Sequence, residues 1–335
     1  MVIGIVLGLA SAFVWATTSL AMKTQSEQID ALSANTFRMI VAAILFLLLL
    51  PFFGGLDALA QISDGAKLAL AVSFIFGVAL GDTLYFWSMT QIGAARAMPL
   101  SSIYPLFTWA MAVPILGEPI TFKAIIGTAL VLIGVYLLTP RISTQPVISR
   151  SVPSERSKSK DRDEKSHSSD SEISRGVYSE RSEAARNDIE SNARAKRIGT
   201  LAAIVAALLW AISTTLLKMG LQDGLNVVVI NSFRMPVGAL VMLAMVYGRL
   251  GKQAWRGIHR QNLLSLILVG IYSTGIGMTL WTLSVEYTGA ARAALLVTLA
   301  PLIGVPLSVF LLKERITRAI VIGTGICVAG IWLIL

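Results

Sequence analysis

Charged side chains interrupt long apolar stretches of this sequence at Arg38, Asp82 and Arg234. A charge in the middle of a membrane span costs at least about 2.5–3.5 kcal/mol, so such a residue usually faces a cavity, a solute or a partner. The carboxyl group of Asp82 could take up a proton or bind a cation, or it could pair with Arg38. The two arginines could bind an anionic group of a solute, or they could bond helix-end carbonyls and snorkel. These residue types favour reversible binding of charge inside an apolar protein.

Aromatic residues form a second group inside the apolar stretches: Trp15, Tyr85, Tyr104, Trp210 and Trp281. Tryptophan and tyrosine usually mark the membrane–water interface, but Tyr85 and Trp281 lie too deep in their stretches for that position. These rings could form stacking walls around an organic molecule, and tryptophan faces also attract cations. Ordinary helix packing is the alternative for all five.

Two prolines, Pro105 and Pro301, interrupt further apolar stretches. A proline removes a backbone donor and clashes with the preceding helical turn, so we expect each to kink its helix. Transporters use such kinks in cavity walls and gates, although kinks also occur in membrane proteins without a gate. We interpret Arg96, Arg292 and Glu118, at the ends of the same stretches, as topology and loop-bonding residues.

Residue groups that carry soluble enzyme chemistry are missing from the sequence. The single cysteine, Cys327, lies in an apolar run, and the two histidines, His167 and His259, lie in hydrophilic stretches. Neither an internal disulfide nor a metal cluster is therefore expected. The HExxH, Walker, GxSxG and GxGxxG motifs are absent from the sequence as well. We expect no catalytic residue, no metal site, no cofactor and no enzymatic activity.

The composition is that of a membrane protein. Hydrophobic residues make up 55% of the chain and charged residues 14%, with a mean hydropathy of +0.72. Soluble domains carry about 45–50% apolar and about 25% charged residues. The net charge of +9 and the pI near 9.8 could indicate nucleic-acid binding, but basic loops beside membrane spans explain the same charge. The expected partner is the lipid bilayer and not nucleic acid.

Ten windows along the chain are apolar enough to cross a bilayer, which takes about 20 residues. They lie at about 2–22, 32–53, 67–88, 95–116, 121–139, 198–218, 226–247, 262–283, 291–312 and 317–335. Backbone polar groups in hydrocarbon must be satisfied within the segment, so the windows predict ten transmembrane helices and an all-α integral membrane fold. Residues 141–197 are rich in Ser, Arg, Lys, Asp and Glu, which predicts a disordered hydrophilic linker with a short helix near Glu180–Lys196.

The two halves of the sequence repeat one another. The segment NTFRM at Asn35–Met39 matches NSFRM at Asn231–Met235, and GAARA at Gly93–Ala97 recurs unchanged at Gly289–Ala293, 196 residues later. Each half holds five predicted spans, and an odd number means that the second half enters the membrane from the opposite side. The repeats are therefore predicted to be inverted. Secondary transporters are often built in this way, with a site between the repeats near the membrane midplane.

This pattern resembles the drug/metabolite transporter superfamily, of the EamA type with two five-helix repeats. The residues that carry the resemblance are Trp15 with Lys23, Phe37 with Arg38, and the closing stretch from GDTLYFW to GVYLL, which the second half repeats. The resemblance covers residues 1–140 and 198–335 as two EamA-like repeats and leaves out the linker, 141–197. It implies a secondary active transporter that exports small metabolites, amino-acid-like or organic, or xenobiotics by alternating access.

The repeat also shows which candidate site residues have a counterpart in the other half. Arg38 and Arg234 occupy matching positions, whereas Asp82 has no acidic counterpart because Met278 stands in its place. This asymmetry favours a functional role for Asp82. We expect the first, third and fourth spans and their counterparts in the second half to enclose a central cavity for the small-molecule substrate.

Lysine and arginine are concentrated in the linker and in the loops on its side of the membrane. The positive-inside rule therefore places the linker in the cytoplasm and both termini outside, whereas the family resemblance favours termini inside; we favour the charge distribution. We expect a multi-pass protein of the cell membrane that could act as a monomer, because both repeats lie in one chain. The alternative is a non-transporting membrane scaffold whose linker recruits a cytosolic partner.

Overall fold

The computed structural model describes residues 1–25, 29–92, 97, 100–119, 121–138, 170–221, 225–300, 303 and 318–334. Throughout these ranges the regular secondary structure is helical, without a strand, which confirms the all-α fold. The chain divides into two compact units. The first combines Met1–Pro140 with Gly199–Leu335, and the second is Arg141–Ile198.

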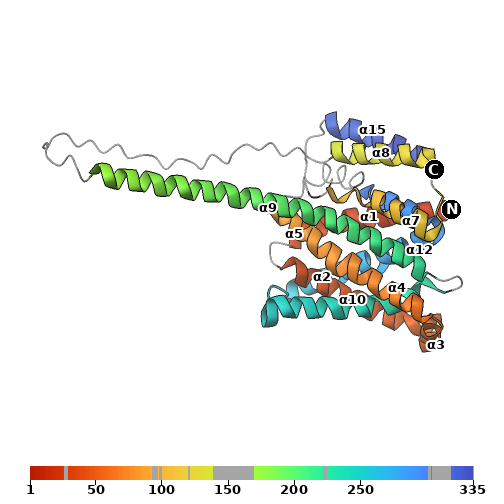
Figure 1. Cartoon of the computed structure of the whole chain (residues 1–335). Coiled ribbons are helices and arrows are strands. Elements are labelled where there is room, and N and C mark those ends of the chain that lie inside the picture. The colour runs from red at the N-terminus through yellow and green to blue at the C-terminus, as the bar shows by residue number, and fades with distance from the viewer. Residues whose placement is uncertain are drawn as a thin grey trace. The chain divides into compact units, whose positions relative to one another are not determined.

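The helices of the first half follow one another along the chain in Figure 1. They are α1 (Val2–Gln25), α2 (Ala31–Leu49), η1 (Leu50–Phe53), α3 (Gly55–Ala60), α4 (Asp64–Phe74), η2 (Ile75–Asp82), α5 (Thr83–Ile92), α7 (Tyr104–Leu116) and α8 (Phe122–Leu138). The segment η2 is π-helical and joins α4 to α5 in one continuous helical stretch.

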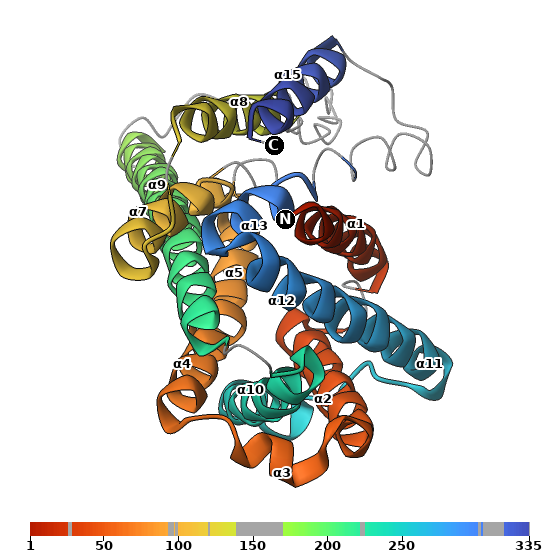
Figure 2. The same ribbon diagram turned by 90° about the vertical axis from the view of Figure 1, so that its right-hand side faces the viewer.

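The helices of the second half follow in the same way, and Figure 2 labels the α-helices among them. They are α9 (Asp170–Gly220), α10 (Val227–Leu250), η3 (Gly251–Gln253), α11 (Arg260–Val269), η4 (Gly270–Ile276), α12 (Gly277–Thr288), α13 (Ala290–Val297) and α15 (Arg318–Ile334). The segment η4 is again π-helical and joins α11 to α12.

Five helical stretches in the described residues are long and apolar enough to cross a membrane. They are Leu32–Phe53, Asp64–Ile92, Arg194–Gly220, Val227–Gln253 and Asn262–Thr288. Shorter apolar segments of α1, α7, α8 and α15 coincide with four more of the predicted windows. The remaining window, 291–312, begins in α13 and continues mostly outside the described residues. The multi-span helical architecture is thus confirmed.

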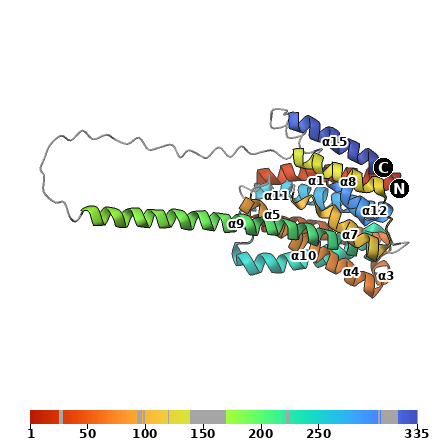
Figure 3. The ribbon, with the colours of Figure 1, turned by 45° about the horizontal axis from the view of Figure 1, so that its top comes forward.

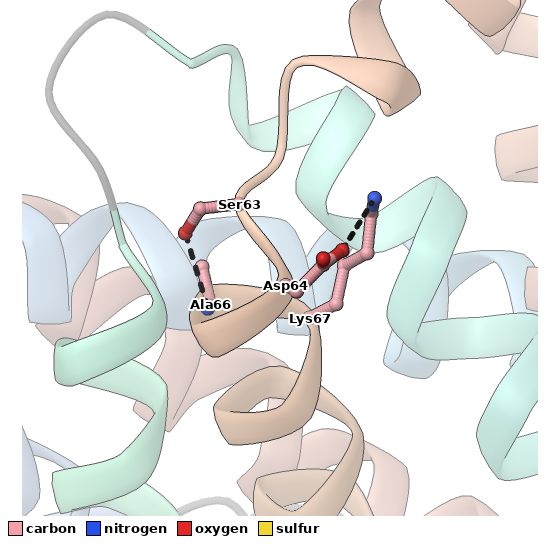
Figure 4. A network of polar contacts seen from close by, with 4 residues as sticks. All are labelled: Ser63, Asp64, Ala66 and Lys67. Atoms are coloured by element: carbon pink, nitrogen blue, oxygen red, sulfur yellow. Dashed lines mark hydrogen bonds and ion pairs between the residues drawn. The ribbon is translucent and has the colours of Figure 1, made fainter.

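Capping side chains fix where several helices begin. Asp30 and Asn226, which match in the repeat, accept backbone hydrogen bonds at the first turns of α2 and α10. Ser63 accepts a hydrogen bond at the start of α4, where Asp64 and Lys67 form an exposed ion pair (Figure 4). A cap of this kind contributes typically about 1 kcal/mol, whereas an exposed ion pair contributes little.

Equivalent helices of the two halves pack antiparallel, as α2 and α10 show. The hydroxyl of Thr36 donates a 3.4 Å hydrogen bond to the carbonyl of Met242, and the hydroxyl of Ser232 donates a 2.9 Å bond to the carbonyl of Phe46. Ser232 matches Thr36 in the repeat, and Met242 matches Phe46. The same hydrogen bond is therefore made twice, with the roles of the two helices exchanged, which places the start of each helix beside the end of the other.

The last helices of the two halves, α8 and α15, repeat this antiparallel arrangement (Figure 3). A methyl group at Gly134 would lie 2.7 Å from the carbonyl oxygen of Gly323, and one at Gly330 would lie 2.7 Å from that of Gly127. Gly330 matches Gly134 in the repeat, and Gly323 matches Gly127, so the same close contact is made twice. Glycine at these positions allows the two backbones to approach closely, as is typical of helix pairs in membranes.

Two positions in the repeat depart from regular α-helix. The π-helical segments η2 and η4 occupy matching places in the third and eighth predicted spans. A π-helical turn inside an α-helix often marks a functional site. These segments give the two halves the same local irregularity, and Asp82 lies at the end of one of them.

The helix α9 begins at Asp170, well before the sixth predicted span. The helical part of the linker region is therefore longer than the short helix expected near Glu180–Lys196. Frequent Ala, Arg and Glu residues favour helix there, because these residue types have high helix propensity. Residues 139–169 lie outside the described residues.

Pro105 lies near a helix start and does not kink a helix, although the sequence predicted a kink. A short turn precedes α7, and Pro105 occupies the first turn of that helix, where its missing N–H has no partner to lose. The helix is thus broken before Pro105 rather than kinked at it. Pro301 lies outside the described residues. Pro114 and Pro236, which the sequence analysis did not single out, lie inside α7 and α10.

Candidate functional site

Asp82 lies where the π-helical segment η2 passes into α5. Its Oδ1 accepts a hydrogen bond of 2.9 Å from Nε1 of Trp210 on α9. The two residues belong to different halves of the repeat, so this bond connects the first half to the second. A hydrogen bond to a charged acceptor contributes about 1.5–3 kcal/mol.

Two tyrosine rings surround Trp210. The ring centroid of Tyr85 lies 5.1 Å from that of Trp210, and the centroid of Tyr104 lies 5.9 Å away in an edge-on arrangement. The hydroxyl of Tyr104 donates a 2.5 Å hydrogen bond to the carbonyl of Ala294 in α13. We call Asp82, Tyr85, Tyr104 and Trp210 the Trp210 cluster. It joins residues of the third, fourth and sixth predicted spans and, through Ala294, contacts the ninth.

A second aromatic contact occupies the matching place in the other half. Trp15 of α1 and Trp281 of α12 have ring centroids 5.7 Å apart. Trp15 matches Trp210 in the repeat, and Trp281 matches Tyr85. The five aromatic residues singled out in the sequence therefore form three ring contacts in two groups, and each group joins one half of the chain to the other.

Each of the two tryptophans lies against a glycine of the facing helix. A methyl group at Gly81 would lie 2.8 Å from Cδ1 of Trp210, and one at Gly277 would lie 3.2 Å from Nε1 of Trp15. Gly81 and Gly277 match in the repeat. The tryptophans therefore fix helix contacts, which is the packing role that the sequence left open, while Trp210 also bonds Asp82.

Arg38 lies on α2 and is partly buried. Its guanidinium interacts electrostatically with the carboxylate of Asp82, although no nitrogen–oxygen distance between them is 4.0 Å or less. The Nε atom of Arg38 is buried without a hydrogen-bond partner. The pairing of Asp82 with Arg38, one alternative from the sequence, is therefore an attraction between separated charges rather than a direct ion pair.

Arg234 lies on α10 in a different environment. Its side chain is 2% exposed, and its Nη1 and Nη2 atoms donate hydrogen bonds of 3.4 Å to Thr282 and 3.3 Å to Ser73. The guanidinium carbon lies 5.5 Å from the ring centroid of Phe74. No carboxylate of the described residues lies within 4.0 Å of it. The two repeat-matched arginines are thus chemically distinct, one beside a carboxylate and the other among hydroxyls.

A cavity of about 130 Å³ lies between the start of α2, the helix α5 and the end of α10. Its lining includes Asn35, which precedes Arg38 by one helical turn, and Thr83, which follows Asp82. Its outer lining includes Thr90 and Arg249, which are exposed. The cavity therefore lies at the ends of these helices, and two of its lining residues are close in sequence to Arg38 and Asp82.

Glu118 has a structural role that the sequence only outlined. Its carboxylate accepts hydrogen bonds of 2.6 Å from the N–H of Ala290 and 3.1 Å from that of Ala291, at the start of α13. A carboxylate at a helix N-terminus satisfies free donors and complements the helix dipole. Loop bonding, as expected for Glu118, is confirmed. Within the described ranges no group of three metal-binding side chains occurs.

Sequence reasoning missed the neighbours of Arg234. Ser73 and Phe74 lie in an ordinary apolar run, and Thr282 directly follows Trp281, so none of them carries a distinctive motif. Their meeting depends on how α4, α10 and α12 pack. One signal in the sequence indicated that the surroundings of Arg234 differ from those of Arg38: Met278 stands at the position that matches Asp82.

A model of the EamA-like transporter family matches residues 2–139 and again residues 197–335. The chain belongs to the EamA-like transporter family. The residues between the two matches are 140–196. Membership in this family confirms the resemblance to the drug/metabolite transporter superfamily that the sequence indicated.

Curated relatives carry transporter names. An uncharacterized transporter of Archaeoglobus fulgidus is 30% identical over 135 residues, which is 40% of this chain and 47% of that protein. The uncharacterized transporter YvbV of Bacillus subtilis is 26% identical over 149 residues, 43% of this chain and 47% of that one. The chain thus spans about half the length of the curated relatives it matches.

A solved crystal structure shares the fold along nearly the whole chain. Its TM-score is 0.70 at 15% sequence identity, and the match covers 98% of this chain and 95% of the other. At this identity the likeness concerns the fold alone.

Proposed function

We propose that this EamA-like transporter is a secondary active transporter of the cell membrane that exports small organic metabolites, amino-acid-like or otherwise, or xenobiotics by alternating access. The observation that carries the proposal is the hydrogen bond between Trp210 and Asp82, which places an ionisable group at a contact between the two halves. A carboxyl group there can change charge at the place where the halves must separate and rejoin.

In this mechanism the two repeats have inverted topology and move against one another about a central path. The antiparallel packing of α2 with α10 and of α8 with α15 supports that symmetry. Exchanging the conformations of two such repeats exchanges the side of the membrane to which the path opens. The helix break before Pro105, and a corresponding break that the repeat predicts at Pro301, would act as the gates.

Asp82 is the coupling residue in this proposal. When its carboxylate is ionised, it holds the indole N–H of Trp210 and attracts Arg38. Protonation removes the charge that strengthens both interactions, so the contact between η2 and α9 weakens. Proton binding would thereby be linked to separation of the two halves, and a proton gradient could drive export.

The aromatic residues and the arginines would contact the substrate. Rings of Trp15, Tyr85, Tyr104, Trp210 and Trp281 lie at the two contacts between halves and would form stacking walls on either side of the path. Arg38 and Arg234 would bind an anionic group of the substrate. Both repeats lie in one chain, so the transporting unit would be a monomer.

Flux from liposomes tests the proposal. The purified full chain is reconstituted into liposomes loaded with amino acids, organic acids and drug-like cations, and mass spectrometry follows what leaves with and without a pH gradient. We expect selective loss of one chemical class, accelerated by the gradient, and loss of the acceleration in Asp82→Asn. The matched control is Asp57→Asn, since Asp57 is exposed in the short helix α3. Absence of selective flux from folded protein would contradict the proposal.

A further inference from the structure

The two halves of the protein place unequal charge inside the membrane. Arg38 and Arg234 occupy matching positions on α2 and α10, and Asp82 faces Arg38 from the first half. At the position that matches Asp82, the second half carries Met278, which has no charge. Among these four matched positions there are thus two guanidinium groups and one carboxylate. The unbalanced positive charge belongs to Arg234.

The surroundings of Arg234 solvate its charge without neutralising it. Its side chain is 2% exposed, and Ser73 and Thr282, which accept its hydrogen bonds, are completely buried. Both bonds are longer than the usual 2.7–3.2 Å, and the Nε atom has no partner among the described residues. The ring of Phe74 adds a cation–π contact, which attracts the charge but does not balance it. A buried charge is costly unless an opposite charge accompanies it.

An amide side chain lies on the same face of α10 as Arg234. Asn231 precedes Arg234 by three residues, which places the two side chains on adjacent turns of one helix face. Asn231 is completely buried, and neither its Oδ1 nor its Nδ2 atom has a hydrogen-bond partner in the described part of the chain. Its amide N–H groups are therefore free to donate to a ligand, as is the Nε–H of Arg234.

We infer that Arg234 and Asn231 bind a small monovalent anion at the meeting of α4, α10 and α12. One uncompensated charge calls for one negative charge, and complete burial of the surrounding side chains restricts the ligand to the size of a carboxylate group or a halide ion. The guanidinium supplies charge and N–H donors, and the amide supplies further donors. The anion is either a free inorganic ion or the carboxylate of the transported molecule, and only the second source rests on the proposed function.

The repeat itself provides the sharpest variant. In Met278→Asp the second half acquires the carboxylate that the first half already has at Asp82, so Arg234 gains a counter-charge from the protein. Met278→Asn is the matched control, because it introduces a polar side chain of the same shape without charge. Arg234→Gln removes the cation itself.

Thermal unfolding of the purified full chain measures anion binding without any transport. Sodium chloride and sodium acetate are titrated at constant ionic strength, with all variants measured in the same buffers so that general salt effects cancel. We expect a saturable rise of the unfolding midpoint in the wild type, about 5 °C at 100 times the dissociation constant. The rise should persist in Met278→Asn and disappear in Met278→Asp and Arg234→Gln.

The two anions distinguish the sources. A rise with acetate alone indicates that the site takes a carboxylate, and a rise with both anions indicates a free inorganic ion. A wild-type midpoint that does not respond to either anion overturns the inference, as does a response that survives in both Met278→Asp and Arg234→Gln. If these variants do not fold, equilibrium dialysis of wild-type protein with radiolabelled chloride and acetate decides the question, since the inference requires one bound anion per chain.

Failure of the proposed function gives a different result. A protein without selective flux that still shows the anion-dependent midpoint, abolished by Met278→Asp, would have the anion site without the transport activity. A protein with flux and no anion dependence would keep the transport proposal and lose the anion site.

Discussion

Trp210 donates its indole N–H to the carboxylate of Asp82 across the two halves of the chain, at 2.9 Å. At the matching place of the other half, Trp15 lies against Gly277 and the neighbouring residue is Met278. The contact of Trp210 therefore includes an ionisable side chain, whereas the matching contact of Trp15 has the apolar side chain of Met278 at the equivalent position. If the two halves made identical contacts, the conformation open to one side of the membrane and the conformation open to the other would bind protons equally well. In the proposed mechanism, this asymmetry would make protons favour one of the two states.

Trp210→Phe should separate the hydrogen bond from the ring contacts. Phenylalanine keeps an aromatic ring beside Tyr85 and Tyr104 but cannot donate to Asp82. We expect the free energy of unfolding to fall by about 1.5–3 kcal/mol, together with weaker dependence of flux on the pH gradient. The control is Trp255→Phe, which removes an indole bond to Tyr247 away from the Trp210 cluster. Equal pH dependence of flux in the wild type and Trp210→Phe would contradict a coupling role for this bond.

Gly81→Ala should act on the same contact through packing alone. The added methyl group would lie 2.8 Å from Cδ1 of Trp210 and 2.9 Å from the carbonyl oxygen of Phe76, so Trp210 must move away. Overpacking of a buried contact costs typically about 1–3 kcal/mol, which thermal unfolding would detect as a lower midpoint. Gly65→Ala is the control, because nothing lies within 4 Å of a methyl group there. Alanine is favoured over glycine in a helix, so the control should be neutral or slightly stabilising.

The membrane spans and the repeat could be predicted from the sequence, since hydropathy and self-similarity are local properties of the chain. Counting five spans per half predicted inverted repeats, but it did not predict that α2 would lie beside α10. The bond between Trp210 and Asp82 could not be predicted, because it depends on how η2 and α9, distant in sequence, are placed side by side. The same holds for Arg234, whose partners Ser73 and Thr282 have no motif. The π-helical segments also lack a sequence signal of the kind that caps and prolines provide.

Glu118→Gln should weaken the start of α13 without touching the Trp210 cluster. The glutamine oxygen can still accept one of the bonds from Ala290 and Ala291, but the negative charge that complements the helix dipole is lost. We expect a decrease of about 0.5–1.5 kcal/mol in the free energy of unfolding, with pH-dependent flux retained. Unfolding midpoints of Glu118→Gln and of the exposed control Asp57→Asn should therefore differ. An unchanged midpoint would show that the carboxylate charge does not matter for this cap.

Cysteine labelling should reveal which side of the membrane the cavity near Asp82 faces. The charge distribution places the end of α5 on the cytoplasmic side, together with the linker and Arg249. The only native cysteine, Cys327, is buried, so Thr90→Cys provides an exposed thiol at the cavity mouth. Asp57→Cys, in the short helix after the opposite end of α2, is its counterpart on the other side. A membrane-impermeant maleimide added to intact cells should label Asp57→Cys and label Thr90→Cys only after the membrane is opened. The reverse pattern would place both termini in the cytoplasm, and the cavity would then open to the outside.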